Sequence, residues 1–240
     1  MKQHAPLSVI IPTYQHGSTI GACLESIFAQ SLLPEEIIVV NDGSTDNTKE
    51  LLQAYENRLI IIHQENQGNQ YARNKGFDVS HNPYVIFCDA DIVMQRDMLE
   101  KMYKKLEQHA EASYVYCRWR FFWKRFSSFP FDAERLRKMN FIHTTSLIRR
   151  DHFPGFDVHI KKFQDWDVWL SMLEEKHVGI FIDEELFQIQ EAKHRTGISH
   201  WLPKYAYRIP WAILHWKPKR IDRYEQAREI IFQKHRIHHS

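Results

Sequence analysis

Two carboxylates separated by one residue, Asp89 and Asp91, end an uninterrupted apolar run that begins at Val85. A run of Val, Ile and Phe is typical of a strand buried on both faces, so we expect the acids at its carboxyl end, where open α/β sheets bind ligands. Oxygen ligands at this spacing can share one divalent cation and leave positions for water and a phosphate-bearing substrate. The alternative is a pair of solvated loop acids.

The residues before Asp89 alternate between predicted strands and helices. Apolar runs predict strands over residues 7–11, 37–40, 59–62 and 84–88, and helical spacing predicts helices between them, the third ending at Gly76. This alternation indicates βαβ units and a parallel sheet. The polar residues 12–14 and 41–43, which follow the first two strands, are then expected at the same sheet edge as the two acids.

The second half of the chain is less regular. Short strands are predicted over residues 114–118, 143–148, 178–182 and 186–189. A helix predicted over Phe163–Leu173 begins with Asp165 and Asp167, either of which could simply cap it. The aromatic and basic residues 119–131 suit stacking on bases or sugars, or equally an amphipathic segment that covers the sheet.

Composition narrows the classes of function. The 240 residues carry a net charge of only +2, which gives no global basic field for nucleic acid. The three cysteines are scattered in apolar runs, which indicates buried thiols in a reducing compartment. No signal peptide precedes the first strand and no apolar run is long enough to span a membrane, so we expect a cytoplasmic protein.

Two common nucleotide-binding motifs are absent from the sequence. No GxGxxG follows the first predicted strand, and no GxxxxGK[ST] occurs anywhere in the chain. The nucleotide site of a dehydrogenase or of a P-loop enzyme is therefore not supported.

Five motifs in order resemble the family 2 glycosyltransferases of the GT-A fold, typified by bacterial enzymes that build surface polysaccharides. They cover roughly residues 6–173 and comprise SVIIPTY at 8–14, EIIVVNDGSTD at 36–46, NQG at 66–68 with ARNKG at 72–76, DAD at 89–91 and QDWDVWL at 164–170. The resemblance implies an α/β fold with a Rossmann-like, mostly parallel sheet flanked by helices. It implies a catalytic domain over 1–200, with a nucleotide-binding half (1–110) and an acceptor half (111–200), followed by a basic, aromatic, helical tail (201–240).

The resemblance also implies roles for individual residues. A nucleotide-sugar donor, with UDP favoured, would have its base held by Pro12, Thr13, Tyr14 and Asp42. Arg73 would lie near its phosphate or ribose, although a helix-surface salt bridge is the alternative. The Asp89-Ala90-Asp91 motif would bind the donor and Mn²⁺ or Mg²⁺, with Asp91 as the direct ligand.

The same resemblance assigns the chemical step. Asp165 would be the general base of an inverting transfer of one sugar to a saccharide or lipid-linked acceptor. Arg195, in the loop formed by residues 194–197, would close over the diphosphate. Asn41 and Gln164 stand where the family frequently has Asp and Glu, and the QxxRW signature of processive synthases is absent.

Two alternative functions and one additional contact are also compatible with the sequence. A sugar-nucleotidyltransferase would normally have a Gly-rich, Arg- or Lys-containing loop after the first strand, and residues 12–18 contain one Gly and no Arg or Lys. A non-catalytic module that binds a nucleotide sugar is the second alternative. The Trp and Tyr residues of the tail, which has nine Lys and Arg from Lys204 to Ser240, also suit a peripheral contact with an anionic membrane, or ordinary packing of the tail on the domain.

Overall fold

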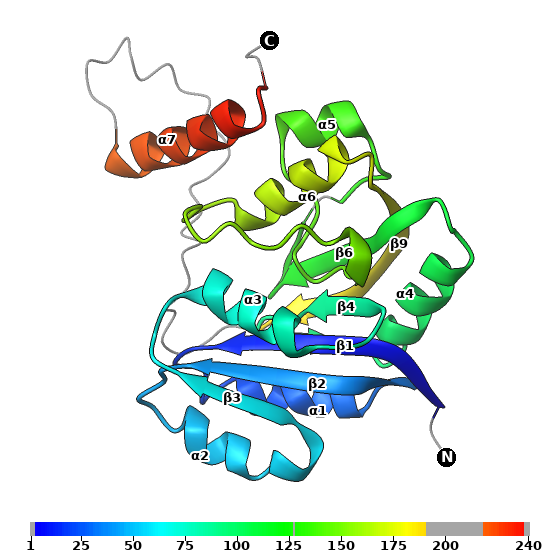
Figure 1. Ribbon diagram of the computed structural model, residues 1–240, viewed down its shortest axis with the longest axis vertical. Helices are drawn as coiled ribbons and strands as arrows, with labels where there is room; N and C mark the ends of the chain where they lie inside the picture. Colours follow the sequence, from blue (N-terminus) through cyan, green and yellow to red (C-terminus); the bar gives the residue numbers. More distant parts are fainter. Residues whose placement is uncertain (1–2, 127, 191–217, 238–240) are drawn as a thin grey trace.

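The computed structural model describes residues 3–126, 128–190 and 218–237, and its organising element is a nine-stranded mixed sheet (Figure 1). Its first four strands are β1 (Gln3–Thr13), β2 (Leu32–Asp42), β3 (Ile60–Gln64) and β4 (Tyr84–Phe87). All pairings among these four are parallel, and they run in the order β3-β2-β1-β4. The predicted βαβ arrangement is therefore confirmed for the first half of the chain.

The rest of the chain extends this sheet with both antiparallel and parallel pairings. It contributes β5 (Ile92–Met94), β6 (Ala112–Phe121), β7 (Lys124–Arg125), β8 (Leu147–Arg149) and β9 (Val178–Ile189). The sheet continues from β4 in the order β8-β6-β9-β5, with β7 paired to β6. β8 runs antiparallel to both β4 and β6, whereas β6 and β9 are parallel.

Helices cover both faces of the sheet. One hydrophobic core lies beneath α1 (Ile20–Phe28), α2 (Thr48–Gln53) and α4 (Met98–Glu107). A second core lies beneath α3 (Asn69–Val79), α5 (Ala133–Lys138), α6 (Gln164–Glu174) and α7 (Lys219–Lys234). Short 3₁₀ turns occupy Glu56–Arg58 and Arg150–His152. Within β1, Val9 and Ile11 face the first core and Ile10 faces the second, as the alternation of side chains along a strand requires.

Several predicted boundaries are wrong for identifiable reasons. The third helix does not end at Gly76 but continues to Val79. The glycine is required by close packing on the sheet and is not a helix end, since a Cβ there would lie 2.4 Å from Ile10 Cγ2. Residues 143–146 are not strand, and β8 begins only at Leu147. The two strands predicted over 178–189 form the single strand β9, since β6 pairs with its whole length across register shifts.

The C-terminal part is only partly described. Helix α7 confirms a helix within residues 201–240, and it lies beyond α6 at the end of the molecule farthest from α2 (Figure 1). Residues 201–217 of the predicted membrane contact, which is expected over the tail 201–240, and the domain boundary at residue 200 lie outside the described residues. None of the described helices is long and apolar enough to cross a membrane.

Candidate active site

The predicted site residues from β1, β2 and β4 share the carboxyl edge of the parallel strands. Thr13 pairs with Asn41. The N–H of Cys88, which directly follows β4, donates to the carbonyl of Ile10 in β1, and Asp89 is the next residue. Thr13 is buried, whereas Tyr14 at the end of the strand is 38% exposed. The structure therefore brings together the loops that the sequence predicted to meet.

Gln15 ties the loops after β1 and β2 to each other. Its side-chain carbonyl accepts from the backbone N–H groups of Thr45 (3.2 Å) and Asp46 (3.0 Å), and its amide donates to the Thr45 hydroxyl (2.7 Å). The Asp46 carboxylate in turn accepts from Gly17 N–H at 2.9 Å. We call these two loops, residues 13–17 and 41–46, the donor rim.

Asp42 holds the loop that leads into α3. Its Oδ1 accepts from Gln64 Nε2 (2.7 Å) and Gln67 N–H (2.9 Å), and its Oδ2 accepts from Gly68 N–H (2.8 Å). A carboxylate offers about four acceptor positions. One position is left after these three bonds, so the predicted contact of Asp42 with the base of a nucleotide stays a prediction.

Arg73 forms an ion pair with Asp89 in which Nη2 and Oδ1 are 2.5 Å apart. Arg73 lies one turn before Gly76 on the buried face of α3, so the close approach that Gly76 permits also brings the guanidinium to the strand end. Burial is the largest single influence and acts to raise the pKa of Asp89, but the charge and hydrogen bond of Arg73, together with His143 and His16, outweigh it and hold that pKa below its ordinary value. Asp89 is therefore a carboxylate at neutral pH.

The donor set at this edge fits a divalent cation. Asp89 and Asp91 are hard oxygen ligands on one short loop, and diphosphate oxygens and water are ordinary further ligands for Mg²⁺ or Mn²⁺. Among the described residues, no group of three or more His, Cys, Asp and Glu side chains is placed to hold a metal by itself. A cation here would accordingly be held by two carboxylates and completed by the substrate.

Asp165 lies in the first turn of α6 and faces the same site. Burial raises the pKa of its carboxyl above the ordinary value, against the opposing effects of the Trp166 N–H hydrogen bond and the charge of Arg73. The Asn140 side chain also hydrogen-bonds to it. A carboxylate with a raised pKa is a stronger base than an exposed Asp, which suits proton abstraction.

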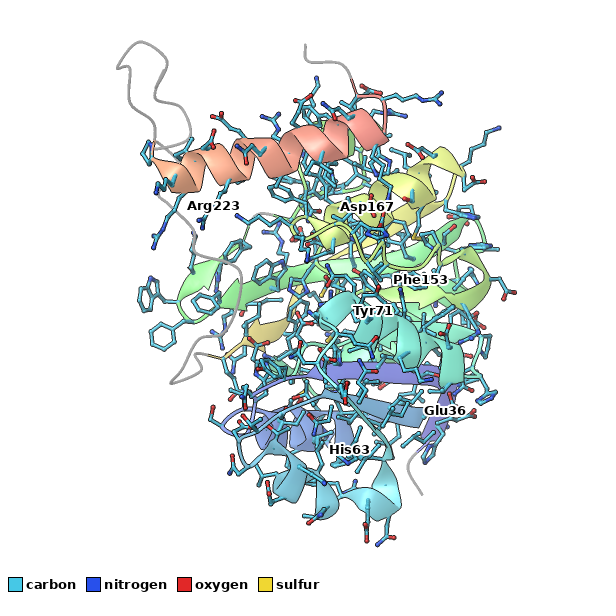
Figure 2. The ribbon with its side chains drawn as sticks, turned by 60° about the vertical axis from the view of Figure 1, so that its left-hand side comes forward. Glu36, His63, Tyr71, Phe153, Asp167 and Arg223 are labelled. Carbon is cyan, nitrogen blue, oxygen red and sulfur yellow. The ribbon has the colours of Figure 1, made fainter. Side chains whose placement is uncertain are left out.

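Asp167 has a different environment, although it lies only two residues farther along. Residues two apart in a helix point about 200° from each other, and Asp167 faces α7, as Figure 2 shows. Its buried carboxylate contacts Lys234 Nζ and His235 Nε2, each at 2.8 Å. The His235 Nδ1 reaches Glu174 at 2.8 Å. Asp167 is thus committed to holding the C-terminal helix.

The segment before β8 runs between Asp165 and Asp89. We call residues 140–146 the crossing segment; its backbone is held to α6 by a hydrogen bond from Trp169 Nε1 to the Ile142 carbonyl (3.1 Å). Since Ile86 of β4 pairs antiparallel with Leu147, the residues just before Leu147 lie beside those just after Ile86. His143 lies near enough to Asp89 for the charge of that carboxylate to act on it.

Sequence reasoning missed two histidines near Asp89. Burial lowers the pKa of His143 to about 4, with Arg73 acting in the same direction and Asp89 opposing. Burial likewise lowers the pKa of His16, which is opposed by Asp89 and Asp46. An isolated His carries no motif, and the antiparallel pairing of β8 with β4, which would have revealed His143, had no sequence signal.

Several buried polar atoms around this edge have no hydrogen-bond partner in the part of the chain that the structure describes. They are Thr13 Oγ1, Arg73 Nε, Thr145 Oγ1 and Gln190 Nε2. Gln190 also adjoins the acid pair, because its N–H donates to the Asp91 carbonyl at 2.8 Å. Unpaired buried polar atoms are costly in a finished interior, so these four atoms are candidates for contact with a polar ligand.

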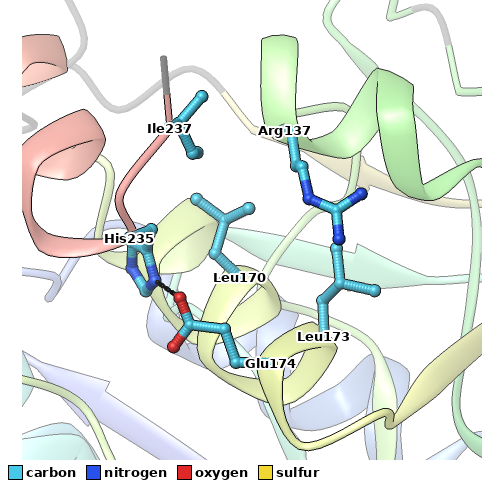
Figure 3. A pocket seen from close by; sticks show the side chains of 6 residues that line it. All are labelled: Arg137, Leu170, Leu173, Glu174, His235 and Ile237. Atoms are coloured by element: carbon cyan, nitrogen blue, oxygen red, sulfur yellow. Dashed lines mark hydrogen bonds and ion pairs between the residues drawn. The ribbon is translucent and has the colours of Figure 1, made fainter.

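Two other features lie apart from this edge. A cavity of about 160 Å³ sits between α5, α6 and the residues that follow α7 (Figure 3), lined by Arg137, Leu170, Leu173, Glu174, His235 and Ile237. Of the aromatic stretch 119–131, Trp119 and Phe126 stack on each other at 4.0 Å, whereas Trp123 is 82% exposed. Arg195 and the rest of the loop 194–197 lie outside the described residues.

Comparison with known proteins decides the family. The model of the family described as "Glycosyl transferase family 2" matches residues 8–161, which is more than half of the chain. The chain belongs to glycosyl transferase family 2. The match contains the donor rim, Arg73, both strand-end acids and the crossing segment, and it ends just before α6.

Relatives in the family support the assignment over most of the chain. The putative teichuronic acid biosynthesis glycosyltransferase TuaG of Bacillus subtilis is 29% identical over 218 residues, which cover 81% of this chain and 82% of that protein. Other curated relatives are longer, and the aligned part of this chain spans only 15% to 35% of the length of five of them.

Solved structures show the same fold. The S. aureus TarS fragment 1–349 in complex with UDP-GlcNAc superposes with a TM-score of 0.66 at 18% identity, covering 84% of this chain and 63% of that one. The mannosyltransferase PcManGT of Pyrobaculum calidifontis, in complex with GDP-Man and Mn²⁺, gives a TM-score of 0.61 at 21% identity, covering 80% and 58%. The expected GT-A fold is confirmed.

Proposed function

We propose that this protein is an inverting, metal-dependent glycosyltransferase that moves one sugar from a nucleotide-sugar donor, with UDP favoured, to a saccharide or lipid-linked acceptor. The observation that carries the proposal is the contrast between Asp165 and Asp167. Asp167 is bound by Lys234 and His235, whereas Asp165 has a raised pKa and faces the Arg73–Asp89 pair. One acid of the helix is thereby assigned to chemistry and the other to structure.

The donor rim and the strand-end acids would bind the donor. Pro12, Thr13, Tyr14 and Asp42 would contact the nucleoside, in the half of the chain formed by residues 1–110. Arg73 fixes the Asp89 carboxylate by their ion pair, so the acid is oriented before a ligand arrives. Support comes from the related folds that were solved with UDP-GlcNAc and with GDP-Man and Mn²⁺.

Transfer would proceed by a single displacement. The acceptor hydroxyl oxygen forms a bond to the anomeric carbon as the bond from that carbon to the diphosphate breaks, and Asp165 takes the hydroxyl proton. The nucleoside diphosphate leaves with the electron pair of the broken bond. A cation held by Asp89 and Asp91 supplies Lewis acidity toward that diphosphate when bound. A positioned base typically contributes about 10²–10⁴-fold to such a reaction.

Donor hydrolysis tests the proposal without knowledge of the acceptor. UDP-glucose, UDP-N-acetylglucosamine and GDP-mannose are incubated with the full chain and Mn²⁺, and release of the nucleoside diphosphate is measured with and without EDTA. Release that EDTA abolishes is expected for at least one donor. If the chain binds nucleotide sugars without turnover, the non-catalytic alternative replaces the proposal. Pyrophosphate release from a nucleoside triphosphate and a sugar phosphate would instead identify a sugar-nucleotidyltransferase.

The acceptor and the cellular site follow as less direct parts of the proposal. Residues 111–200 would form the acceptor half, since they supply Asp165 and the crossing segment. TuaG is named for teichuronic acid biosynthesis, which supports a surface-polysaccharide acceptor. A cytoplasmic protein with a peripheral contact of residues 201–240 at an anionic membrane would meet a lipid-linked acceptor there, and salt-dependent co-sedimentation with anionic vesicles tests that contact.

A further inference from the structure

The crossing segment contains polar groups that the proposed roles above do not use. Asn140 at its start contacts the base Asp165, and His143 lies close enough to Asp89 for the charge of that carboxylate to act on it. Three residues span at most about 10 Å of chain. The segment therefore runs from the acid that would take the proton to one of the acids that would hold the diphosphate.

The hydrogen-bonding state of His143 is fixed by its neighbour. The backbone N–H of Thr145 donates to His143 Nδ1 at 3.0 Å, so Nδ1 is an acceptor and the ring hydrogen is on Nε2. The ring is also packed against Trp119 and Phe187, with centroids 4.8 Å and 5.0 Å away. His143 is thus an oriented, neutral imidazole with an N–H donor.

Thr145 adds a second polar group on the same segment. It is 1% exposed, and its hydroxyl has no hydrogen-bond partner among the residues that the structure describes. It lies two residues before Leu147, the first residue of β8, which pairs with Ile86 of β4, three residues before Asp89. A buried hydroxyl without a partner is costly unless a ligand or water satisfies it.

We infer that His143 and Thr145 form the subsite for the sugar of the donor, with the imidazole Nε2–H and the Thr145 hydroxyl hydrogen-bonding to sugar hydroxyl groups. The inference rests on the proposed function and deepens it. In that function the sugar lies between the diphosphate and the base, and the crossing segment runs between the acids that would serve these two groups. Neutral donors and acceptors suit a neutral sugar, whereas Arg73 and the cation serve the charged diphosphate. A site built to hydrogen-bond a substrate hydroxyl also rejects analogues that lack it.

The test compares a nucleotide sugar with its nucleoside diphosphate. The donor that the wild-type chain hydrolyses fastest, among the three named above, and the matching UDP or GDP are titrated calorimetrically in the presence of Mn²⁺. His143→Leu is expected to weaken binding of the nucleotide sugar about tenfold, and Thr145→Val about threefold to tenfold, as the loss of one neutral hydrogen bond implies. Binding of the nucleoside diphosphate should change less than twofold in both variants.

Conservative variants and the nucleoside diphosphate keep the test interpretable. His143→Gln retains an N–H donor and Thr145→Ser retains the hydroxyl, so both should bind the nucleotide sugar within about threefold of wild type. Unchanged affinity for the nucleoside diphosphate also shows that each variant is folded. Equal losses for the two ligands, or no loss in His143→Leu and Thr145→Val, would overturn the subsite while leaving the proposed function intact. A wild-type chain that binds none of the donors would overturn both.

Discussion

The donor rim and the crossing segment lie at the same sheet edge but differ in how their polar groups are satisfied. In the rim, Gln15 alone makes four hydrogen bonds to the loop after β2, and Asp42 makes one to the end of β3 and two to the loop before α3. In the crossing segment, Thr145 keeps a buried hydroxyl without a partner among the described residues. Apart from the buried Thr13 hydroxyl, which also has no partner among the described residues, the rim is bonded within itself, whereas we propose that the segment is completed by the sugar that binds to it.

This difference indicates a division of labour. Loops that are bonded to each other keep one shape whether or not a ligand is present, which suits recognition of the nucleotide common to many donors. Unsatisfied donors and acceptors select a ligand by its own hydroxyl pattern. We therefore expect variants at the edge to separate into those that change donor binding, those that change transfer alone and those that change stability alone.

The largest effect is expected at the strand-end acid that the resemblance makes the direct metal ligand. Asp91→Ala should abolish the Mn²⁺-dependent part of UDP binding, because the described residues contain no group of three or more His, Cys, Asp and Glu side chains that could hold the cation in its place. Calorimetry with UDP and Mn²⁺ measures this. Asp78→Ala removes an equal charge from an exposed position near the end of α3 and should bind like wild type. Full affinity in the Asp91 variant would refute the metal site.

Asp165→Asn should separate transfer from binding. The amide keeps the shape of the side chain but cannot accept the proton, so turnover should fall at least about a hundredfold while donor affinity is retained. Since burial raises the pKa of Asp165, the acid limb of kcat/KM in the wild type should lie above the pH range of an ordinary Asp. The measurement is a pH profile of turnover with the hydrolysed donor. A lost donor affinity in this variant would contradict the assignment.

Asp167→Asn is expected to reduce stability and not chemistry. Its carboxylate is buried against His235 and Lys234, and Lys234 is about one-third exposed, so we reduce the usual cost of breaking a buried pair to about 1–3 kcal/mol. Urea unfolding gives the free energy of unfolding. Per folded molecule, turnover should stay within a few-fold of wild type. A hundredfold loss of turnover here, with Asp165→Asn active, would reverse the roles of the two acids.

Gln15→Ala tests the rigidity of the donor rim. Removal of its side-chain bonds to residues 45 and 46 should raise KM for the donor several-fold with little change in kcat, because the loops must then be ordered by the ligand. Steady-state hydrolysis kinetics provide both constants. The conservative variant Gln15→Glu keeps the acceptor oxygen and should lie between the two. An unchanged KM in Gln15→Ala would show that the rim needs no such tie.

The smallest effect concerns the pH dependence of the contact between α6 and α7. Burial acts to lower the pKa of His235, but its bonds to Asp167 and Glu174 outweigh burial and raise it. A raised folded-state pKa stabilises fully below the unfolded value of about 6.5 and is lost as pH rises through the folded value. The difference in Tm between wild type and His235→Gln should therefore shrink from pH 6 to pH 9. A constant difference would show that His235 contributes by packing alone.

The sequence predicted the parts of the fold that local patterns determine. Apolar runs placed β1, β2, β3 and β4, and the chirality of βαβ units placed their polar ends together. It failed where tertiary contacts override local pattern. Gly76 looked like a helix end but is a contact point on Ile10, and β9 is one strand because β6 pairs with its whole length.

The candidate site was predictable only as far as its motifs extend. Asp89 and Arg73 stand in motifs, yet their mutual ion pair depends on how closely α3 packs on β1. Asp165 and Asp167 are the same residue type at the start of one helix, so the sequence does not distinguish their roles. The distinction comes from Lys234 and His235 at the end of α7, which contact Asp167 and lie more than 50 residues away in sequence. His143 and Thr145 precede β8, whose antiparallel pairing with β4 no short pattern encodes.

Helix α7 has a practical consequence for handling the protein. Ile231 and Phe232 are buried in the same core as α6. Lys234 and His235 bind Asp167, which lies in the same first turn of α6 as Asp165. A chain that ends before residue 219 would lack α7. Apolar residues of α6 would then be exposed, and the buried Asp167 carboxylate would lose Lys234 and His235. Cleavage at a protease site engineered between residues 191 and 217 should instead yield two fragments that co-purify, because α7 in the shorter fragment packs on α6 in the longer one.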